Sequence, residues 1–137
     1  MIRPAPRKGR DETPHWVAAR AGRLVLPYCE HCRRFEWPAR PTCAVCAAPL
    51  LWRECAGTGT LLTWSVVHRA ASPDWSGETP YVVAMIELDE GARLMSNVVE
   101  YEPAQLACGQ RVRARFVETT DPELGLVVFA PDNGFRS

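Results

Sequence analysis

The spacing of apolar and polar residues changes part way along this chain of 137 residues. From residue 57 onward, apolar residues recur mostly at every second position, the period of a β-strand with one face turned inward. We expect strands over 58–69, 81–88, 93–99, 111–117 and 126–129. Before residue 57, prolines and paired cysteines interrupt the pattern, so two differently built regions follow one another.

Three of these strands carry specific predictions. The first should place alternate residues on one face, namely Thr60, Leu62, Trp64, Val66 and His68. The stretch 81–88 is apolar on both faces, which is typical of a strand covered on both sides. The stretch 111–117 should turn three residues inward (Val112, Ala114, Phe116) and three outward (Arg111, Arg113, Arg115). Gly91 suits a short hairpin turn after 81–88.

Five short strands with a longer break at 100–110 suit a small closed barrel such as an OB-fold. The pattern alone leaves a β-sandwich open as the alternative. The fold class is therefore mainly β.

The first residues read differently. Residues 1–12 hold two prolines and several basic residues without a hydrophobic period, so we expect an extended arm that is ordered only when something binds it. Thr13 is expected to cap a helix that has Pro14 at its first position and ends at Gly22. Two turns are too few to be stable alone, so Trp16 should anchor this helix on the chain or on a partner.

Four cysteines form the most specific motif of the chain. Cys29, Cys32, Cys43 and Cys46 make two Cys-x-x-Cys pairs ten residues apart, between short strands at 24–26 and 50–52. Such pairs can place four sulfurs around one ion, and Zn²⁺ accepts four thiolates in closed structural sites. Two disulfides are the alternative, which the short spacing within each pair disfavours. His31 is a further, weaker candidate ligand.

Charge and composition bear on the location of the protein and on the two cysteines outside the motif. Sixteen basic and sixteen acidic residues cancel, but residues 1–40 carry a balance of +5 and residues 41–137 one of −5. No apolar run approaches the 20 or so residues of a membrane span, and no signal-peptide pattern is visible, so a cytoplasmic protein is expected. Cys55 and Cys108 are expected to be buried, inert thiols.

These observations divide the chain into an N-terminal arm and helix (1–23), a zinc ribbon (24–52) and an OB-fold domain (53–137).

In this order the motifs resemble a known family, the acyl-CoA-associated zinc-ribbon/OB-fold proteins catalogued as domain of unknown function 35. The resemblance spans about residues 13–131. It lies in the stretches 21–26 (AGRLVL) before the first cysteine pair, 41–46 (PTCAVC), 57–60 (GTGT), 64–69 (WSVVHR), 80–84 (PYVVA) and 88–91 (LDEG).

The resemblance implies a non-catalytic subunit that accompanies a thiolase-like enzyme of acyl-CoA metabolism, in acyl transfer, condensation or steroid side-chain aldol cleavage. It also implies that the ribbon is rubredoxin-like and holds structural zinc on the four cysteines. Such loops often have Gly after each second cysteine, whereas this chain has Arg33 and Ala47. A positive φ at each would cost around 1 kcal/mol, little beside the ~10 kcal/mol that a structural zinc supplies.

Three other functions are possible for a chain of this composition: catalysis by the chain itself, direct acyl-CoA handling and nucleic-acid binding. The chain lacks a known phosphate loop, a Ser-His-Asp or Cys-His spacing, and an open metal site. Direct acyl-CoA handling would place its channel at His68, Arg69, Pro73 and Trp75, whereas partner binding would use Trp16 and Arg20. Nucleic-acid binding would use the Arg111, Arg113 and Arg115 stripe with stacking on Trp64, Tyr81 and Phe116, but the acidic second half of the chain disfavours it.

Overall fold

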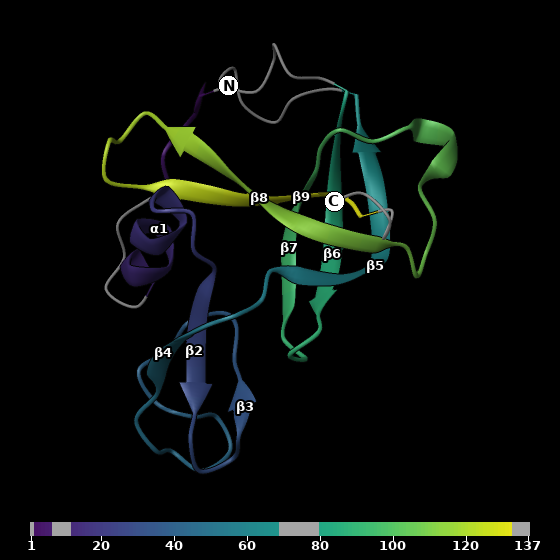
Figure 1. Ribbon diagram of the computed structural model, residues 1–137. Coiled ribbons are helices and arrows are strands. Elements are labelled where there is room, and N and C mark those ends of the chain that lie inside the picture. The colour runs from purple at the N-terminus through teal and green to yellow at the C-terminus, as the bar shows by residue number, and fades with distance from the viewer. Residues whose placement is uncertain (1, 7–11, 69–79, 133–137) are drawn as a thin grey trace.

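The computed structural model describes residues 2–6, 12–68 and 80–132 (Figure 1). Its elements are β1 (Ile2–Arg3), α1 (Thr13–Arg20), β2 (Val25–Cys29), β3 (Arg34–Phe35), β4 (Leu51–Glu54), β5 (Thr58–Val67), β6 (Tyr81–Leu88), β7 (Arg93–Val98), the 3₁₀ turn η2 (Pro103–Gln105), β8 (Arg111–Thr119) and β9 (Gly125–Pro131). No helix in this described part is long and apolar enough to cross a membrane.

Strands β5 to β9 form a closed barrel. Hydrogen-bonded neighbours run in the order β8-β5-β6-β7-β9, and β8 also pairs with β9, which closes the sheet on itself. The β7–β9 contact is parallel and short, as it consists of Val98 opposite Phe129. This order is that of an OB-fold, so the predicted barrel is confirmed over the sandwich alternative.

The cysteine-rich region forms a separate small sheet in the order β3-β2-β4. Figure 1 shows it projecting from the barrel, with α1 beside the junction. The two parts share one hydrophobic core, because the fully buried Leu24 and Leu26 from the start of the ribbon pack with barrel residues such as Leu61, Ile86 and Phe129. The ribbon is therefore anchored at its base and free at its cysteine end.

Helix α1 begins one residue earlier than predicted. Glu12 occupies the cap position without a side-chain hydrogen bond, and Thr13 is already helical. The predicted end is confirmed, because Gly22 takes φ +81° and its N–H donates to the Ala19 carbonyl (3.0 Å), while the Arg23 N–H donates to Ala18 (2.9 Å). These two bonds make a Schellman cap, for which glycine is suited.

The N-terminal arm differs from its prediction where it is described. Residues 2 and 3 pair in parallel with Glu118 and Thr119 of β8. The Arg3 side chain is 2% exposed, and its Nη1 donates to Asn97 Oδ1 (2.9 Å). The start of the arm is thus ordered on the chain's own barrel rather than by a partner. Residues 1 and 7–11 of the arm lie outside the described residues.

Strand β5 does not keep one face. A register shift between Leu61 and Thr63 turns the strand, so Leu61 is buried before the shift and Trp64 packs against the core after it. The predicted single face from Thr60 to His68 is therefore wrong, because a bulge adds a residue to one side of the ladder.

Three burial predictions also need correction. Strand β6 buries alternate residues only, with its other face half-covered, so it is not enclosed on both sides. Phe116 on β8 is 38% exposed although it was expected to face inward. Cys108 is exposed, whereas Cys55 is buried as predicted and burial raises the pKa of its thiol to about 12.

Candidate metal centre

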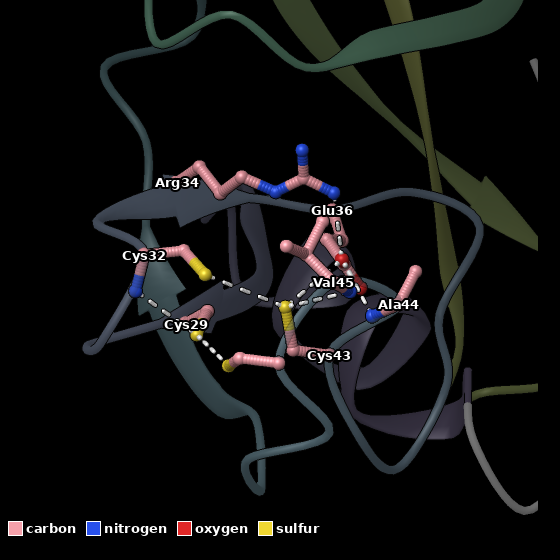
Figure 2. Close-up of polar contacts among 8 residues, drawn as sticks. Cys29, Cys32, Arg34, Glu36, Cys43, Ala44 and Val45 are labelled. Atoms are coloured by element: carbon pink, nitrogen blue, oxygen red, sulfur yellow. Dashed lines mark hydrogen bonds and ion pairs between the residues drawn. The ribbon is translucent and has the colours of Figure 1, made fainter.

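The four motif cysteines converge at the free end of the ribbon. Their sulfur atoms all lie within 4.8 Å of one another. Cys29 and Cys43 are buried, whereas Cys32 and Cys46 are half-buried. Figure 2 shows the sulfurs of Cys29, Cys32 and Cys43 turned toward one another from two loops. Cys29 Sγ lies 3.6 Å from Cys46 Sγ, and Cys43 Sγ lies 3.9 Å from Cys32 Sγ.

Both cysteine loops fold alike. The Arg33 N–H donates to the Cys29 carbonyl (2.7 Å), and the Ala47 N–H donates to the Cys43 carbonyl (2.9 Å). Backbone N–H groups also point at sulfur, from Cys32 to Cys29 (3.3 Å) and from Val45 to Cys43 (3.4 Å). Arg33 and Ala47 have φ of 56° and 62°, so the left-handed conformation expected after each second cysteine is present without glycine.

The electrostatics of this cluster fit a cation. The Cys32 N–H lowers the pKa of Cys29 to about 7, whereas the pKa of Cys32 rises to about 12, first because of its hydrogen bond with Cys46. Four thiols this close cannot all ionise alone, because each thiolate opposes the next. A divalent cation removes that opposition. Four sulfurs also complete a tetrahedral shell, so the donor set fits structural Zn²⁺ and leaves no position for substrate.

A buried carboxylate lies against this centre. Glu36 follows β3 and is 7% exposed, and its Oε1 accepts hydrogen bonds from the Ala44 N–H (3.0 Å) and from Arg34 Nη2 (2.9 Å). The same oxygen is 3.5 Å from Cys43 Sγ. Burial acts to raise the pKa of Glu36, but the bonds from Arg34 and Ala44 outweigh it and lower that pKa.

The other predicted site residues lie apart from the metal centre. His68 follows β5 and is exposed, while Arg69, Pro73 and Trp75 lie outside the described residues. His31 is exposed and is not one of the clustered ligands. Trp16 and Arg20 are both half-buried on α1.

Trp16 belongs to an aromatic cluster that the sequence did not reveal. His15 is buried and lies between the rings of Trp16 and Trp37, each 4.5 Å away between centroids. Its Nδ1 is 2.9 Å from the Val25 carbonyl, so that nitrogen carries the proton, and burial lowers the pKa of the ring. The cluster borders a hollow of about 250 Å³ that continues over β7 and β9 and includes Met95, which is 70% exposed. The sequence indicated only that Trp16 anchors the helix, and it did not identify His15 and Trp37 as its neighbours.

The arginine stripe of β8 is outward-facing, as predicted, but it is paired. Arg111 makes two 2.7 Å bonds to the Asp89 carboxylate. Arg113 lies 3.3 Å from Asp132, and Arg115 lies 3.5 Å from Glu100. Each positive charge therefore has a carboxylate beside it, and the stripe does not form the free positive surface that phosphate binding requires.

Two family models match the chain in sequence. Residues 16–51 match the ChsH2 rubredoxin-like zinc ribbon domain, and residues 52–117 match the ChsH2 C-terminal OB-fold domain. The zinc ribbon and the OB-fold predicted from the sequence are thus both confirmed.

Curated relatives fall into two groups. A probable enoyl-CoA hydratase alpha subunit of Thermomonospora curvata is 39% identical over 132 residues, which cover 95% of this chain but 40% of that protein. This chain therefore spans well under half the length of that relative. A DUF35 domain-containing scaffold protein of Methanocaldococcus jannaschii is 37% identical, with 68% of this chain and 67% of that protein covered.

Solved structures agree with these relatives. The structure named Ltp2-ChsH2(DUF35) aldolase contains a chain that is 38% identical, with a TM-score of 0.81, covering 92% of this chain and 98% of that one. A DUF35 protein of unknown function from Sulfolobus solfataricus shares the fold at 14% identity and a TM-score of 0.62. A four-cysteine ribbon joined to an OB barrel, matched over most of its length, places this chain in the DUF35 family of zinc-ribbon/OB-fold proteins.

Proposed function

We propose that this protein is a non-catalytic accessory or scaffold subunit of a thiolase-like enzyme that acts on acyl-CoA thioesters. One observation carries the proposal: nearly the whole chain matches the DUF35 chain of the Ltp2-ChsH2(DUF35) aldolase. The names of the relatives, a CoA hydratase subunit and a scaffold protein, support the same class of role. The cytoplasm is the proposed location, because free thiols and zinc sites persist there.

The chemistry of the described residues supports a partner as the site of catalysis. The four clustered sulfurs suit a closed structural site, which activates no water. Within the described ranges, the one hydrogen bond made by a histidine side chain joins His15 to a backbone carbonyl. His68, the candidate acid or base of the barrel, is exposed and has no carboxylate to orient it in this part of the chain. A catalytic pair needs such geometry.

We place partner docking at helix α1. Trp16, Trp37 and the exposed Met95 border one hollow, and Val17 on the same helix is 47% exposed. Aromatic residues around a pocket are frequent energetic centres of protein interfaces. Arg20 lies on the same helix, and its Nη2 is held by Glu118 (3.0 Å). Trp16 and Arg20 are accordingly the proposed contact residues.

The acyl-CoA channel is a finer part of the proposal. We assign its wall on this chain to His68, Arg69, Pro73 and Trp75, of which only His68 lies among the described residues. Channel residues would act by contact with CoA or substrate at a shared interface, without bond chemistry of their own. Acyl-CoA turnover by the isolated protein that is lost in His68→Ala would contradict the non-catalytic role.

The proposal is tested by co-expression with a thiolase-like protein from the same genome and size-exclusion chromatography of the mixture. The expected result is one peak that contains both chains, with Trp16→Ala weakening the association by more than tenfold. Trp52→Ala is the matched control, because Trp52 is 37% exposed on the ribbon strand β4, outside the hollow. A chain that elutes as a monomer beside every such candidate would end the proposal.

A further inference from the structure

We propose that Glu36 is a positioning residue of the metal centre, whose carboxylate fixes the loop carrying Cys43 and Cys46 to the ribbon sheet at strand β2. The ribbon's two cysteine loops come from separate segments of the chain, and each must be held before four sulfurs can meet. The first loop continues directly from β2, since Cys29 is the last residue of that strand. The second loop has only an isolated bridge before Cys43, between Thr42 and Pro49. The Cys43 N–H also donates to the Ala48 carbonyl (2.8 Å), so these contacts close the loop on itself, and the contact from Glu36 joins it to the rest of the ribbon.

Glu36 supplies such a contact. Its own N–H donates to the Pro27 carbonyl on β2 (2.9 Å), so its backbone is fixed to the central strand of the ribbon. Its Oε1 then accepts the Ala44 N–H (3.0 Å) from inside the second loop. Figure 2 shows the carboxylate between Arg34 and this loop. A single side chain thus connects the central strand to the residue that follows the ligand Cys43.

The burial of this carboxylate indicates that its polar contacts matter more than the space that its side chain fills. The Glu36 side chain is 6% exposed, and its second oxygen, Oε2, is buried without a hydrogen-bond partner in the described structure. A buried charged group with an unsatisfied oxygen is costly, and an apolar side chain would fill the same space at lower cost. The hydrogen bond to Ala44 and the ion pair with Arg34 offset this cost, and an apolar side chain could form neither.

Glu36 could affect metal binding in two ways, through its negative charge and through its hydrogen bond to the loop. Its distance from sulfur distinguishes the two. Its Oε1 lies 3.5 Å from Cys43 Sγ, where a thiol can donate a hydrogen bond. A metal-bound thiolate has lost that proton, so carboxylate and sulfur then repel each other, and Arg34 offsets the repulsion. The negative charge of Glu36 should therefore not help metal binding. The oxygen that accepts the Ala44 N–H should help metal binding, because it holds the loop in place.

This distinction gives a direct test. Zinc affinity is measured on the full chain by competition with a chromophoric chelator, and the thiolate-to-metal absorption of the Co²⁺-substituted protein reports four-sulfur coordination. Glu36→Ala removes the accepting oxygen and should weaken zinc about 10- to 100-fold, the usual effect of losing a contact outside the ligand set. Glu36→Gln keeps an accepting oxygen without charge, so its affinity should equal or exceed that of the wild type.

Glu30→Ala is the matched control. Glu30 lies between the ligands Cys29 and Cys32 but is exposed, so its loss changes the local charge equally without removing a loop contact. Its zinc affinity should equal that of the wild type. The proposal is overturned if Glu36→Ala binds zinc as Glu30→Ala does, or if Glu36→Gln is as weak as Glu36→Ala.

A second measurement covers the case in which Glu36→Ala does not fold. Ala44 is exposed, so slow hydrogen exchange of its N–H in the zinc-loaded wild type must come from the bond to Glu36. Protection in the wild type and in Glu36→Gln is the expected result. Exchange at the rate of a free amide in the wild type would overturn the proposal.

Discussion

Arg33 and Ala47 show how a strained backbone is tolerated at single residues. Both take a left-handed conformation after the second cysteine of their pair, where a Cβ atom costs roughly 1 kcal/mol. A structural zinc site contributes about 10 kcal/mol or more to folding, so two such costs are small beside it. This strain was expected because metal-binding loops of this kind often have Gly at the two positions. The cysteine spacing was not sufficient to predict Glu36, because a single Glu outside the motif carries no periodic signal.

Asp89 offers a pH-dependent prediction at this scale. Its two bonds from Arg111, together with one from Thr58, hold the pKa of the carboxyl at about 2. Because this pKa is lowered in the folded state, the contribution to stability is complete above about pH 4 and is lost as the pH falls toward 2. Asp89→Asn should cost under about 1 kcal/mol at pH 7, since the pair is largely exposed.

The measurement is urea unfolding of both proteins between pH 7 and pH 2. The difference in unfolding free energy should be constant down to about pH 4 and then shrink. A difference that persists unchanged at pH 2 would show that the ion pair does not contribute through charge.

Among the elements, we expect the ribbon to depend on bound metal for its stability and the barrel not to. The ribbon strands β3 and β4 are short, and all four residues of β4 are exposed. Leu24 and Leu26, by contrast, are buried in the core shared with the barrel. The segment 24–26 is therefore stabilised by the core that it shares with the barrel. The domain boundary after residue 52 stays a prediction from the sequence.

Removal of zinc with a chelator should consequently unfold the ribbon from its free end. Hydrogen exchange followed by mass spectrometry should show loss of protection over residues 29–50 first, with 24–26 and strands β5 to β9 retained. Cys43→Ser should reproduce this pattern without chelator, because three sulfurs leave the site incomplete. Simultaneous loss of protection in the ribbon and the barrel would contradict it.

Helix α1 depends on a different contact, the close approach of its end to Gly125 on β9. A Cβ placed on Gly125 would lie 2.7 Å from the Arg20 backbone nitrogen. Gly125→Ala should therefore displace the helix and lower the unfolding free energy by about 1 to 3 kcal/mol, the usual cost of overpacking.

Gly91→Ala provides the control for that variant. A Cβ there meets open space and only its φ of +101° is unfavourable. Near-UV circular dichroism of the Trp16 and Trp37 cluster should change in Gly125→Ala and not in Gly91→Ala. An unchanged aromatic spectrum in Gly125→Ala would show that the helix tolerates the added methyl group.

For the whole molecule, the arrangement of charge separates the candidate functions. The arginines of β8 alternate outward as a nucleic-acid surface would require, yet they pair with Asp89, Asp132 and Glu100, which lie far from them in sequence. A protein that binds nucleic acid depends on unpaired positive charge and releases counterions when it binds.

We therefore expect no binding of single-stranded DNA or RNA. Fluorescence anisotropy with a labelled oligonucleotide at roughly 50 mM salt, where such binding is strongest, should show no saturable rise. Asp89→Asn serves as the control, since it frees Arg111 and should be the variant most prone to bind. A salt-dependent signal from the wild type would restore the nucleic-acid alternative.

Features that depend on short spacing along the chain could be predicted before the fold was known. Two Cys-x-x-Cys pairs specified a four-sulfur site, Gly22 specified a helix end, and alternating or continuously apolar stretches specified the barrel strands, because each signal is carried by residues within a few positions. Three features that involve distant segments emerged only from the folded chain: the bond from Arg3 to Asn97, the bulge that turns β5, and the exposure of Phe116. Such contacts depend on which segments the closed barrel brings together, and the local pattern of apolar residues carries no information about these long-range neighbours.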